Sequence, residues 1–302
     1  MEKRIVPIVF ATDDNYVLPL AVAIKSMLDH KNSNDEYRIY IFCDKLSEKS
    51  IDILKQICGG GDYLEIVKIS EYLKGTNFKP IGRITVAAYY RFFIPKVLSQ
   101  YEKVLYVDCD VLFNGDVSSI FDMDLFAEEN VLGVNKMIYQ LAYICDYFNS
   151  GVLLFNVKQY LKENICEQCL EHMKTRKEDV DLFDEAVLND VCCGKVKNFY
   201  FIYNYQTFYL QFKQCIEITK IKSIKDIVII HYSAKPWQTS STPLGNLWWK
   251  TVKKMPKDIK KEIYEKYGQY QKQNDLYYYK YYFASPLGKF IYKIKKKFKK
   301  NK

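Results

Sequence analysis

The sequence of 302 residues contains no run of eighteen or more apolar residues, so no transmembrane helix is predicted. Its first residues, Met1 to Ile5, lead directly into a strand-like segment without the apolar stretch of a signal peptide, which predicts a cytoplasmic protein. The body also lacks a basic face with interleaved aromatic residues, which argues against a nucleic-acid partner. Hydrophobic residues make up 49% of the chain, enough for the core of one large α/β domain or two small ones.

A second well-spaced pair of cysteines is also missing, which argues against a structural zinc site. Cys166 and Cys169 have the spacing of half such a site, with His172 nearby, but they fall in a segment from Val157 to Lys177 that has the pattern of a helix. The nine cysteines are odd in number and lie mostly in apolar segments. We therefore expect reduced cysteines that pack in the core.

Positive charge is concentrated at the C-terminus. The net charge is +9, and the last fourteen residues, from Lys289 to Lys302, contribute eight lysines and no acid. A cluster of tyrosines, Tyr277 to Tyr282, precedes them. This composition fits attachment to the anionic inner surface of a membrane, and it also fits a solvated, frayed C-terminus. The body of the chain is close to neutral, so the net charge says little about the main site.

Strands and helices alternate through the first part of the chain. Strand patterns at Ile5–Phe10, Tyr37–Cys43 and Leu64–Ile69 are separated by helix patterns at Leu18–His30 and Ser47–Cys58, the latter with its first serine as N-cap. This alternation predicts an α/β fold with a doubly wound, mostly parallel sheet. In such a sheet, ligands lie beyond the C-terminal ends of the strands.

The second half of the chain is less regular. We predict a helix from Thr85 to Leu98 and a helical appendage from Pro256 onward, and the tyrosine-rich connection from Lys136 to Phe148 is a candidate binding loop. Short apolar strands are expected at Val131–Asn135, Gly151–Asn156 and Ile227–Tyr232.

Two carboxylates, Asp108 and Asp110, interrupt an apolar run from Val104 to Phe113 that has the pattern of one buried strand. A buried carboxylate without a partner costs several kcal/mol, so these charges need a partner. On an extended chain, residues two apart point to the same side, which would give an anionic oxygen site suited to a divalent cation. The alternative is a strand that ends at Asp108 and turns, since aspartate is common in turns.

Four motifs in this order resemble glycosyltransferase family eight, which includes glycogenin and bacterial lipopolysaccharide galactosyl- and glucosyltransferases. They are Phe10–Tyr16, Tyr106–Asp110, Tyr147–Asn156 and His231–Trp237. The resemblance covers about residues 5 to 250. It implies a GT-A fold, which is a Rossmann-like, mixed and mostly parallel sheet flanked by helices. It also implies UDP-galactose or UDP-glucose as donor, Mn²⁺ with Mg²⁺ as the alternative, and retention of anomeric configuration.

The resemblance also implies a role for each matching position at the nucleotide and the metal. Asp108 and Asp110 match the metal-binding pair, and His231 matches the third protein ligand. A neutral imidazole added to oxygen ligands moves the preference from Mg²⁺ toward Mn²⁺. The remaining positions match residues that bind the nucleotide part of the donor, and they are Ala11, Thr12, Asp13, Asn15 and Cys109.

Further matches surround the phosphates and the donor sugar. Lys235 matches a lysine that contacts the diphosphate, and Arg91, Asn149 and Asp184 match residues around the sugar. Lipopolysaccharide galactosyltransferases have glutamine after the position of Asp184, whereas this chain has Glu185. That carboxylate could act as nucleophile or stabilise an oxocarbenium ion, and it could equally be a residue that only starts a helix.

We therefore predict an Mn²⁺-dependent retaining hexosyltransferase that acts on a glycan or lipid-linked glycan acceptor at the cell surface. Residues 1–255 would form the catalytic domain, and residues 256–302 a helical tail that associates with a membrane. One alternative is a nucleotidyltransferase, although it would need a glycine-rich basic loop where the acidic segment Ala11–Asn15 stands. The other is a non-enzymatic membrane-surface binding module that depends on the tail.

Overall fold

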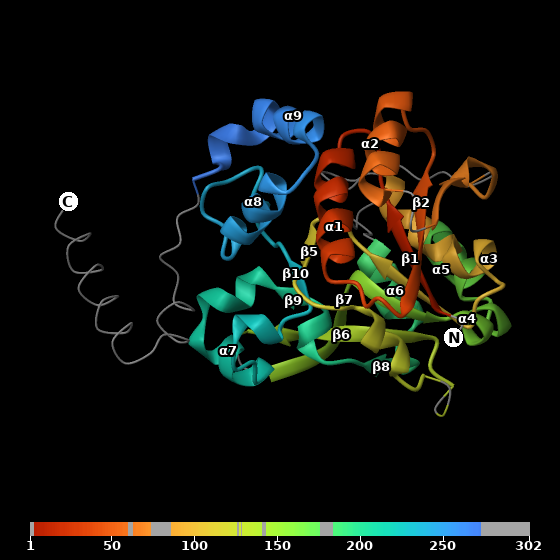
Figure 1. Cartoon of the computed structure of the whole chain (residues 1–302). Coiled ribbons are helices and arrows are strands. Elements are labelled where there is room, and N and C mark those ends of the chain that lie inside the picture. The colour runs from red at the N-terminus through yellow and green to blue at the C-terminus, as the bar shows by residue number, and fades with distance from the viewer. Residues whose placement is uncertain are drawn as a thin grey trace.

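A mixed sheet of seven strands lies at the centre of the computed structural model, which describes residues 3–59, 63–73, 86–125, 127, 129–140, 143–175 and 184–272 (Figure 1). The strand order is β3-β2-β1-β4-β7-β6-β8. The pairs β4–β7 and β6–β7 are antiparallel, and the other neighbours are parallel, which confirms the predicted mixed, mostly parallel sheet. The strands are β1 (Arg4–Ala11), β2 (Asp35–Cys43), β3 (Tyr63–Lys68), β4 (Lys103–Val107), β6 (Leu132–Tyr139), β7 (Tyr143–Asn156) and β8 (Val196–Asn198).

Helices cover both faces of this sheet. Along β4, Leu105 and Val107 pack into one apolar cluster while Val104 and Tyr106 pack into the other, as expected for a strand buried on both sides. The first cluster includes helices α1 (Val17–Asp29), α2 (Glu48–Cys58), α7 (Lys213–Thr219), α8 (Gly245–Lys253) and α9 (Lys257–Tyr267). The second includes α3 (Ile94–Val97), α4 (Val157–Lys162), α5 (Ile165–Thr175) and α6 (Asp184–Val191).

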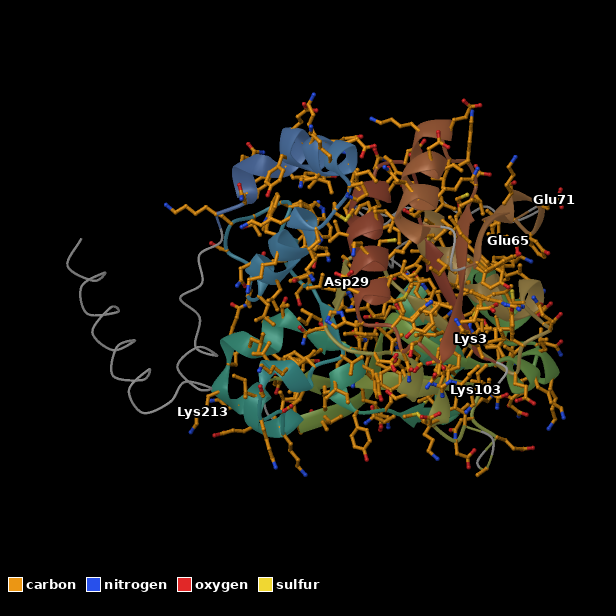
Figure 2. The ribbon with its side chains drawn as sticks, in the orientation of Figure 1. Lys3, Asp29, Glu65, Glu71, Lys103 and Lys213 are labelled. Carbon is orange, nitrogen blue, oxygen red and sulfur yellow. The ribbon has the colours of Figure 1, made fainter. Side chains whose placement is uncertain are left out.

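Charged side chains cover the outside of this core, and Glu71 and Lys213 illustrate them in Figure 2. Helix α9 joins the core through Ile259 and Ile263, which are buried, and through Tyr264, which stacks on Trp249. Among the described helices, none combines the length and the apolar character that crossing a membrane requires. The tyrosine cluster and the lysine tail, residues 273–302, lie outside the described residues.

The apolar run around Asp108 is not one strand, so that prediction is wrong and the alternative of a turn is right. Strand β4 ends at Val107, the chain turns through Asp108–Asp110, and β5 (Val111–Phe113) enters a second sheet. This small sheet has the order β5-β10-β9, with β10 (Ile229–His231) and β9 (Tyr205–Gln206). The turn occurs because β4 pairs with β7 in the large sheet while β5 pairs with β10 in the small one.

Two other predicted elements differ from the structure. The predicted helix 85–98 is a 3-10 helix, η2 (Val86–Phe93), followed by the short α3, and Thr85 lies outside the described residues. The described residues of the connection 136–148 do not form a loop, because β6 and β7 continue as a hairpin in which Ile138 pairs with Ile144, and residues 141 and 142 lie outside the described part. The other 3-10 helices are η1 (Ile69–Glu71), η3 (Ser118–Asp122), η4 (Phe201–Tyr203), η5 (Thr207–Gln211), η6 (Ile224–Asp226) and η7 (Gly268–Tyr270).

The predicted helix 157–177 is two helices. It breaks between α4 and α5, where Asn164 adopts φ 52°, and its last two residues, 176 and 177, fall outside the described part. Cys166 and Cys169 are buried in α5, and His172 pairs with Asp190 at 3.2 Å. The predicted helices over 18–30 and 47–58 are confirmed as α1 and α2, and the Ser47 side chain caps α2 by accepting from the Ser50 backbone N–H.

Candidate active site

A cavity of about 380 Å³ lies beyond the C-terminal ends of β1 and β4, where a doubly wound sheet places its ligands. It gathers most of the predicted site residues, although they come from separate parts of the chain. They are Ala11, Thr12, Asp13, Arg91, Asp108, Cys109, Asp110, Asn149, Asp184, Glu185 and His231.

Two predicted residues, Asn15 and Lys235, do not line this cavity. Asn15 is exposed, and its backbone N–H donates to Asp13 Oδ1 at 2.9 Å. The backbone of the segment predicted to bind the nucleotide is partly engaged, because Thr12 N–H donates to the Phe42 carbonyl in β2. The carbonyl of Ala11 likewise accepts the Cys109 thiol, so these two bonds attach the segment to its neighbours.

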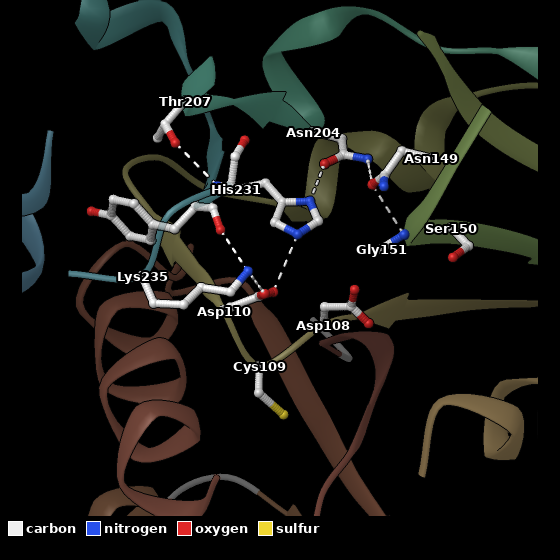
Figure 3. Close-up of polar contacts among 12 residues, drawn as sticks. Asp108, Cys109, Asp110, Asn149, Ser150, Gly151, Asn204, Thr207, His231 and Lys235 are labelled. Atoms are coloured by element: carbon white, nitrogen blue, oxygen red, sulfur yellow. Dashed lines mark hydrogen bonds and ion pairs between the residues drawn. The ribbon is translucent and has the colours of Figure 1, made fainter. Parts of the chain in front are cut away.

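Asp108, Asp110 and His231 converge on one point. Each offers a ligand atom, and these atoms lie within 4.8 Å of one another. The two carboxylates come from the turn after β4, and the imidazole comes from the end of β10 (Figure 3). Because β10 pairs antiparallel with β5, His231 lies opposite Val111 and therefore beside the turn.

The surroundings of these three residues fit a divalent cation. Asp110 Oδ1 is buried without a hydrogen-bond partner. His231 Nε2 lies 3.2 Å from this oxygen, but the two atoms are not aligned as a hydrogen bond. Gly151 keeps the adjacent space open, since a Cβ there would lie 2.3 Å from His231 Cε1 and 2.7 Å from Asp108 Oδ2. Two carboxylates with one imidazole form a donor set suited to a divalent metal ion.

A lysine balances the charge of Asp110. Burial alone would raise the pKa of this carboxyl, but the Lys235 ammonium and the His231 imidazole hold the pKa well below its usual range. Lys235 Nζ pairs with Asp110 Oδ2 and also donates to the Tyr232 carbonyl at 2.7 Å. Asp110 is therefore anionic at physiological pH and able to attract a cation.

Arg91 orients the carboxylates on the other side of the cavity. Its guanidinium is buried and reaches Asp108 Oδ1 and Asp184 Oδ2, each at 3.1 Å. It also donates to the carbonyl of Ser150 at 2.7 Å and to its hydroxyl at 2.8 Å, and it lies 4.5 Å over the Tyr106 ring. Because Tyr106 donates its hydroxyl to Asp108 Oδ1 at 2.6 Å, the position of Asp108 is set from two directions.

Glu185 is held through one of its oxygens. Its Oε2 accepts from Asn149 Nδ2 at 2.8 Å and from the Ser150 backbone N–H at 3.0 Å. Burial raises the pKa of Glu185, and the Ser150 N–H opposes that shift. Glu185 lies in the first turn of α6, so it is both a helix-start residue and a carboxyl group that lines the cavity.

A second cavity, of about 540 Å³, adjoins the first and shares Tyr147 and Glu185 with it. Its other lining residues belong to the β6–β7 hairpin, and they are Met137, Ile138, Tyr143 and Cys145. This cavity is largely apolar, and Glu185 is the one acidic residue among the described residues that line it, whereas several charged residues line the first.

Sequence reasoning missed several residues of the site. Tyr106, Ser150 and Gly151 stand within the four motifs, so the motifs could have indicated them. Asn204 lies in no motif, yet its side chain hydrogen-bonds both His231 and Asn149. No signal in the sequence would have selected Asn204, because it reaches the site only through the pairing of β9 with β10.

Comparisons with known proteins agree with this architecture. The sequence model described as glycosyl transferase family 8 matches residues 7–241. Glycosyltransferase GlyE of Streptococcus pneumoniae serotype 4 is 28% identical over 256 residues, which cover 80% of this chain and 59% of GlyE. A lipopolysaccharide 1,2-glucosyltransferase of Escherichia coli is 25% identical over 256 residues, covering 78% of this chain and 74% of that protein. The chain thus spans about 60% of the length of the pneumococcal relative.

Among solved structures, an active-site glutamine-to-glutamate mutant of LgtC aligns with a TM-score of 0.70 at 25% identity. The alignment covers 84% of this chain and 98% of that one. The galactosyltransferase LgtC in complex with donor and acceptor sugar analogues aligns with a TM-score of 0.64 at 26% identity, covering 77% of this chain and 90% of LgtC. These structures share the fold of the large sheet and its helices.

Proposed function

The chain belongs to glycosyltransferase family 8, and from that premise we propose that it transfers galactose or glucose from a UDP-sugar to a glycan acceptor. We further propose that the reaction retains anomeric configuration and requires Mn²⁺. The relatives that act on lipopolysaccharide support an acceptor of the cell-surface or lipid-linked type. The main support is the convergence of Asp108, Asp110 and His231 at the edge of a cavity sized for a ligand.

In this proposal Asp108, Asp110 and His231 hold the cation. A bound Mn²⁺ neutralises the negative charge that develops on a departing diphosphate. Lys235 pairs with Asp110 and keeps this carboxylate ionised. Lys235 does not itself line the cavity, but its ammonium would add positive charge near the phosphates. Arg91 keeps Asp108 in position, which preserves the geometry of the site.

The remaining lining residues divide between the two ends of the donor. Ala11 ends β1, Thr12 and Asp13 follow it, and these three residues would contact the nucleoside, with Cys109 against Ala11. The exposed Asn15 would contribute at the rim of this end. Residues around Arg91 on the opposite wall would contact the sugar, and they are Asn149, Asp184 and Glu185.

We place the acceptor in the second cavity. Its tyrosines, Tyr143 and Tyr147, can pack against the apolar face of a sugar ring. Because the two cavities share Glu185, an acceptor hydroxyl there would lie next to the donor sugar. The tyrosine-rich connection predicted as a binding loop would thus contribute to the acceptor site, although its described residues form a hairpin.

For the chemical step we favour attack from the face that the diphosphate leaves. The bond between the anomeric carbon and the diphosphate oxygen breaks, the acceptor oxygen bonds to that carbon, and the acceptor proton passes to the leaving phosphate. No enzymic base is needed, and Glu185 would stabilise positive charge on the sugar. The alternative is a covalent intermediate on Glu185, formed by Oε1, the oxygen that Asn149 and the Ser150 N–H do not hold.

The substitution Glu185→Gln distinguishes these mechanisms. We expect turnover to fall by no more than about tenfold if attack is front-side, whereas a loss above about a thousandfold with intact UDP binding would favour the covalent route. Steady-state kinetics and calorimetric titration with UDP measure the two quantities.

The same variant has a pH signature. The pKa of Glu185 is raised in the folded protein, so the ionised carboxylate lowers stability at neutral pH. This cost decreases as pH falls through the raised pKa, and it disappears below the pKa of the unfolded chain. Glu185→Gln should therefore raise the melting temperature at neutral pH and leave it unchanged in acid. An equal shift at both pH values would contradict the burial of an ionised group.

A donor screen tests the whole proposal. UDP-galactose, UDP-glucose and their N-acetyl forms are incubated with the protein, with and without Mn²⁺. Release of UDP and free sugar only with Mn²⁺ supports the assignment, whereas release of sugar 1-phosphate, the product left when UMP is transferred, would indicate a nucleotidyltransferase. Repeating the screen after deletion of residues 277–302 tests the proposed division into a catalytic body and a membrane-associating tail. Loss of all UDP binding in the shortened chain would favour the membrane-surface module.

A further inference from the structure

Asn204 is the buried link between the proposed metal site and Glu185. It lies between η4 and β9, and the pairing of β9 with β10 sets it beside His231. The side chain of Asn204 is fully buried, and the residue His231 is 7% exposed. Asn204 Oδ1 lies 2.9 Å from His231 Nδ1, and Asn204 Nδ2 donates to Asn149 Oδ1 at 2.9 Å (Figure 3).

The orientation of both amides in this series of hydrogen bonds is fixed by neighbouring groups that can only donate or only accept. The Gly151 backbone N–H donates to Asn149 Oδ1 at 3.1 Å, so that atom must be the oxygen. The other end of the Asn149 amide must be the nitrogen, because it faces the Glu185 carboxylate. Asn204 must then present its NH₂ group to Asn149 and its oxygen to His231.

These hydrogen bonds therefore determine which nitrogen of the His231 imidazole must carry a hydrogen. An oxygen that only accepts faces Nδ1, so Nδ1 carries a hydrogen. A bound cation would therefore use Nε2, the ring nitrogen that lies 3.2 Å from Asp110 Oδ1. Rotating either amide would bring two donors or two acceptors together in a buried place, which costs about 1–3 kcal/mol for each unsatisfied group.

We propose that Asn204 is a positioning residue that keeps the proton of His231 on Nδ1 and so directs Nε2 toward the metal. The effect on metal affinity rests on the proposed Mn²⁺ site, whereas the effect on the proton does not. Asn204 also ties this ligand to Asn149 and thereby to Glu185, so one hydrogen-bonded chain connects the metal end of the site with the sugar end.

The test uses the full chain and two substitutions. Asn204→Leu keeps the approximate volume and removes the acceptor, while Asn204→Asp keeps an oxygen for Nδ1. Nitrogen-15 NMR of the metal-free protein at about pH 8.5 reports which ring nitrogen carries the proton. The sequence has only three histidines. His30 is a useful reference, because its Nδ1 lies 2.8 Å from the Ser26 carbonyl and must also be protonated.

We expect a protonated Nδ1 at His231 in the wild type and in Asn204→Asp, and an unprotonated Nδ1 in Asn204→Leu. Electron paramagnetic resonance of free Mn²⁺ should show affinity falling about 10–100-fold in Asn204→Leu and recovering in Asn204→Asp. Asn156→Leu is the matched control, since Asn156 is buried at the far end of β7. It should lower stability through loss of the α4 cap without changing either readout.

An unprotonated Nδ1 in the wild type, or an unchanged Nδ1 in Asn204→Leu, would overturn the proposal. So would a Mn²⁺ affinity in Asn204→Leu equal to that of the wild type. A wild-type protein that binds no Mn²⁺ while its Nδ1 behaves as expected would instead overturn the proposed function, and Asn204 would still position the imidazole.

Discussion

Asp110→Ala is expected to abolish Mn²⁺-dependent turnover, with a loss of at least about a thousandfold, or roughly 4 kcal/mol of transition-state stabilisation. The substitution removes the buried carboxylate whose Oδ1 lacks a hydrogen-bond partner and faces His231. It also leaves the Lys235 ammonium without its carboxylate partner, which adds positive charge where a cation should bind. Steady-state turnover across a Mn²⁺ titration measures the effect.

Two companion variants make this result specific. Asp110→Asn keeps the size of the side chain and removes its charge, so it should lose most Mn²⁺ affinity while the melting temperature stays close to that of the alanine variant. Asp52→Ala removes an exposed carboxylate on α2 and should leave turnover unchanged. Undiminished Mn²⁺-dependent turnover in Asp110→Ala would show that the cation binds elsewhere.

Gly151→Ala should be nearly as damaging although it adds one methyl group. The new Cβ would lie 2.3 Å from His231 Cε1 and 2.7 Å from Asp108 Oδ2, both far inside contact distance. The backbone cannot retreat easily, because the Gly151 carbonyl accepts from the Asp108 N–H at 2.8 Å. Asn204 holds the His231 imidazole and Arg91 holds the Asp108 carboxylate, so neither group can move away without losing a partner. The added methyl group would therefore push the two metal ligands apart.

We therefore expect Gly151→Ala to lower Mn²⁺ affinity at least about a hundredfold and to cost about 1–3 kcal/mol of stability. Gly133→Ala is the matched control on the neighbouring strand β6. Its Cβ would meet the side chain of Leu125 and the Cβ of Leu154, each at 3.3 Å, so it should lose stability and keep Mn²⁺ affinity. Equal Mn²⁺ affinities in the two variants, measured by calorimetry, would show that Gly151 does not shape the metal site.

The sequence by itself determined the type of fold and most of the site. Alternating strand and helix patterns predicted a doubly wound, parallel sheet with ligands beyond its strand ends, because apolar periodicity is a local property, and the family resemblance implied that the sheet is mixed. Ordered motifs predicted a glycosyltransferase of family eight, and the family match confirms it. Asp108, Asp110 and His231 were named as ligands from these motifs, and they do converge.

Tertiary structure alone decided how these groups meet. The sequence favoured one strand from Val104 to Phe113 with both carboxylates on a shared face, whereas the chain turns at Asp108 because β5 leaves for a second sheet. That small sheet is what places His231 beside the turn and Asn204 behind the imidazole. Strand pairing between segments more than a hundred residues apart follows from the packing of the whole chain, so it cannot be predicted from local patterns of residues.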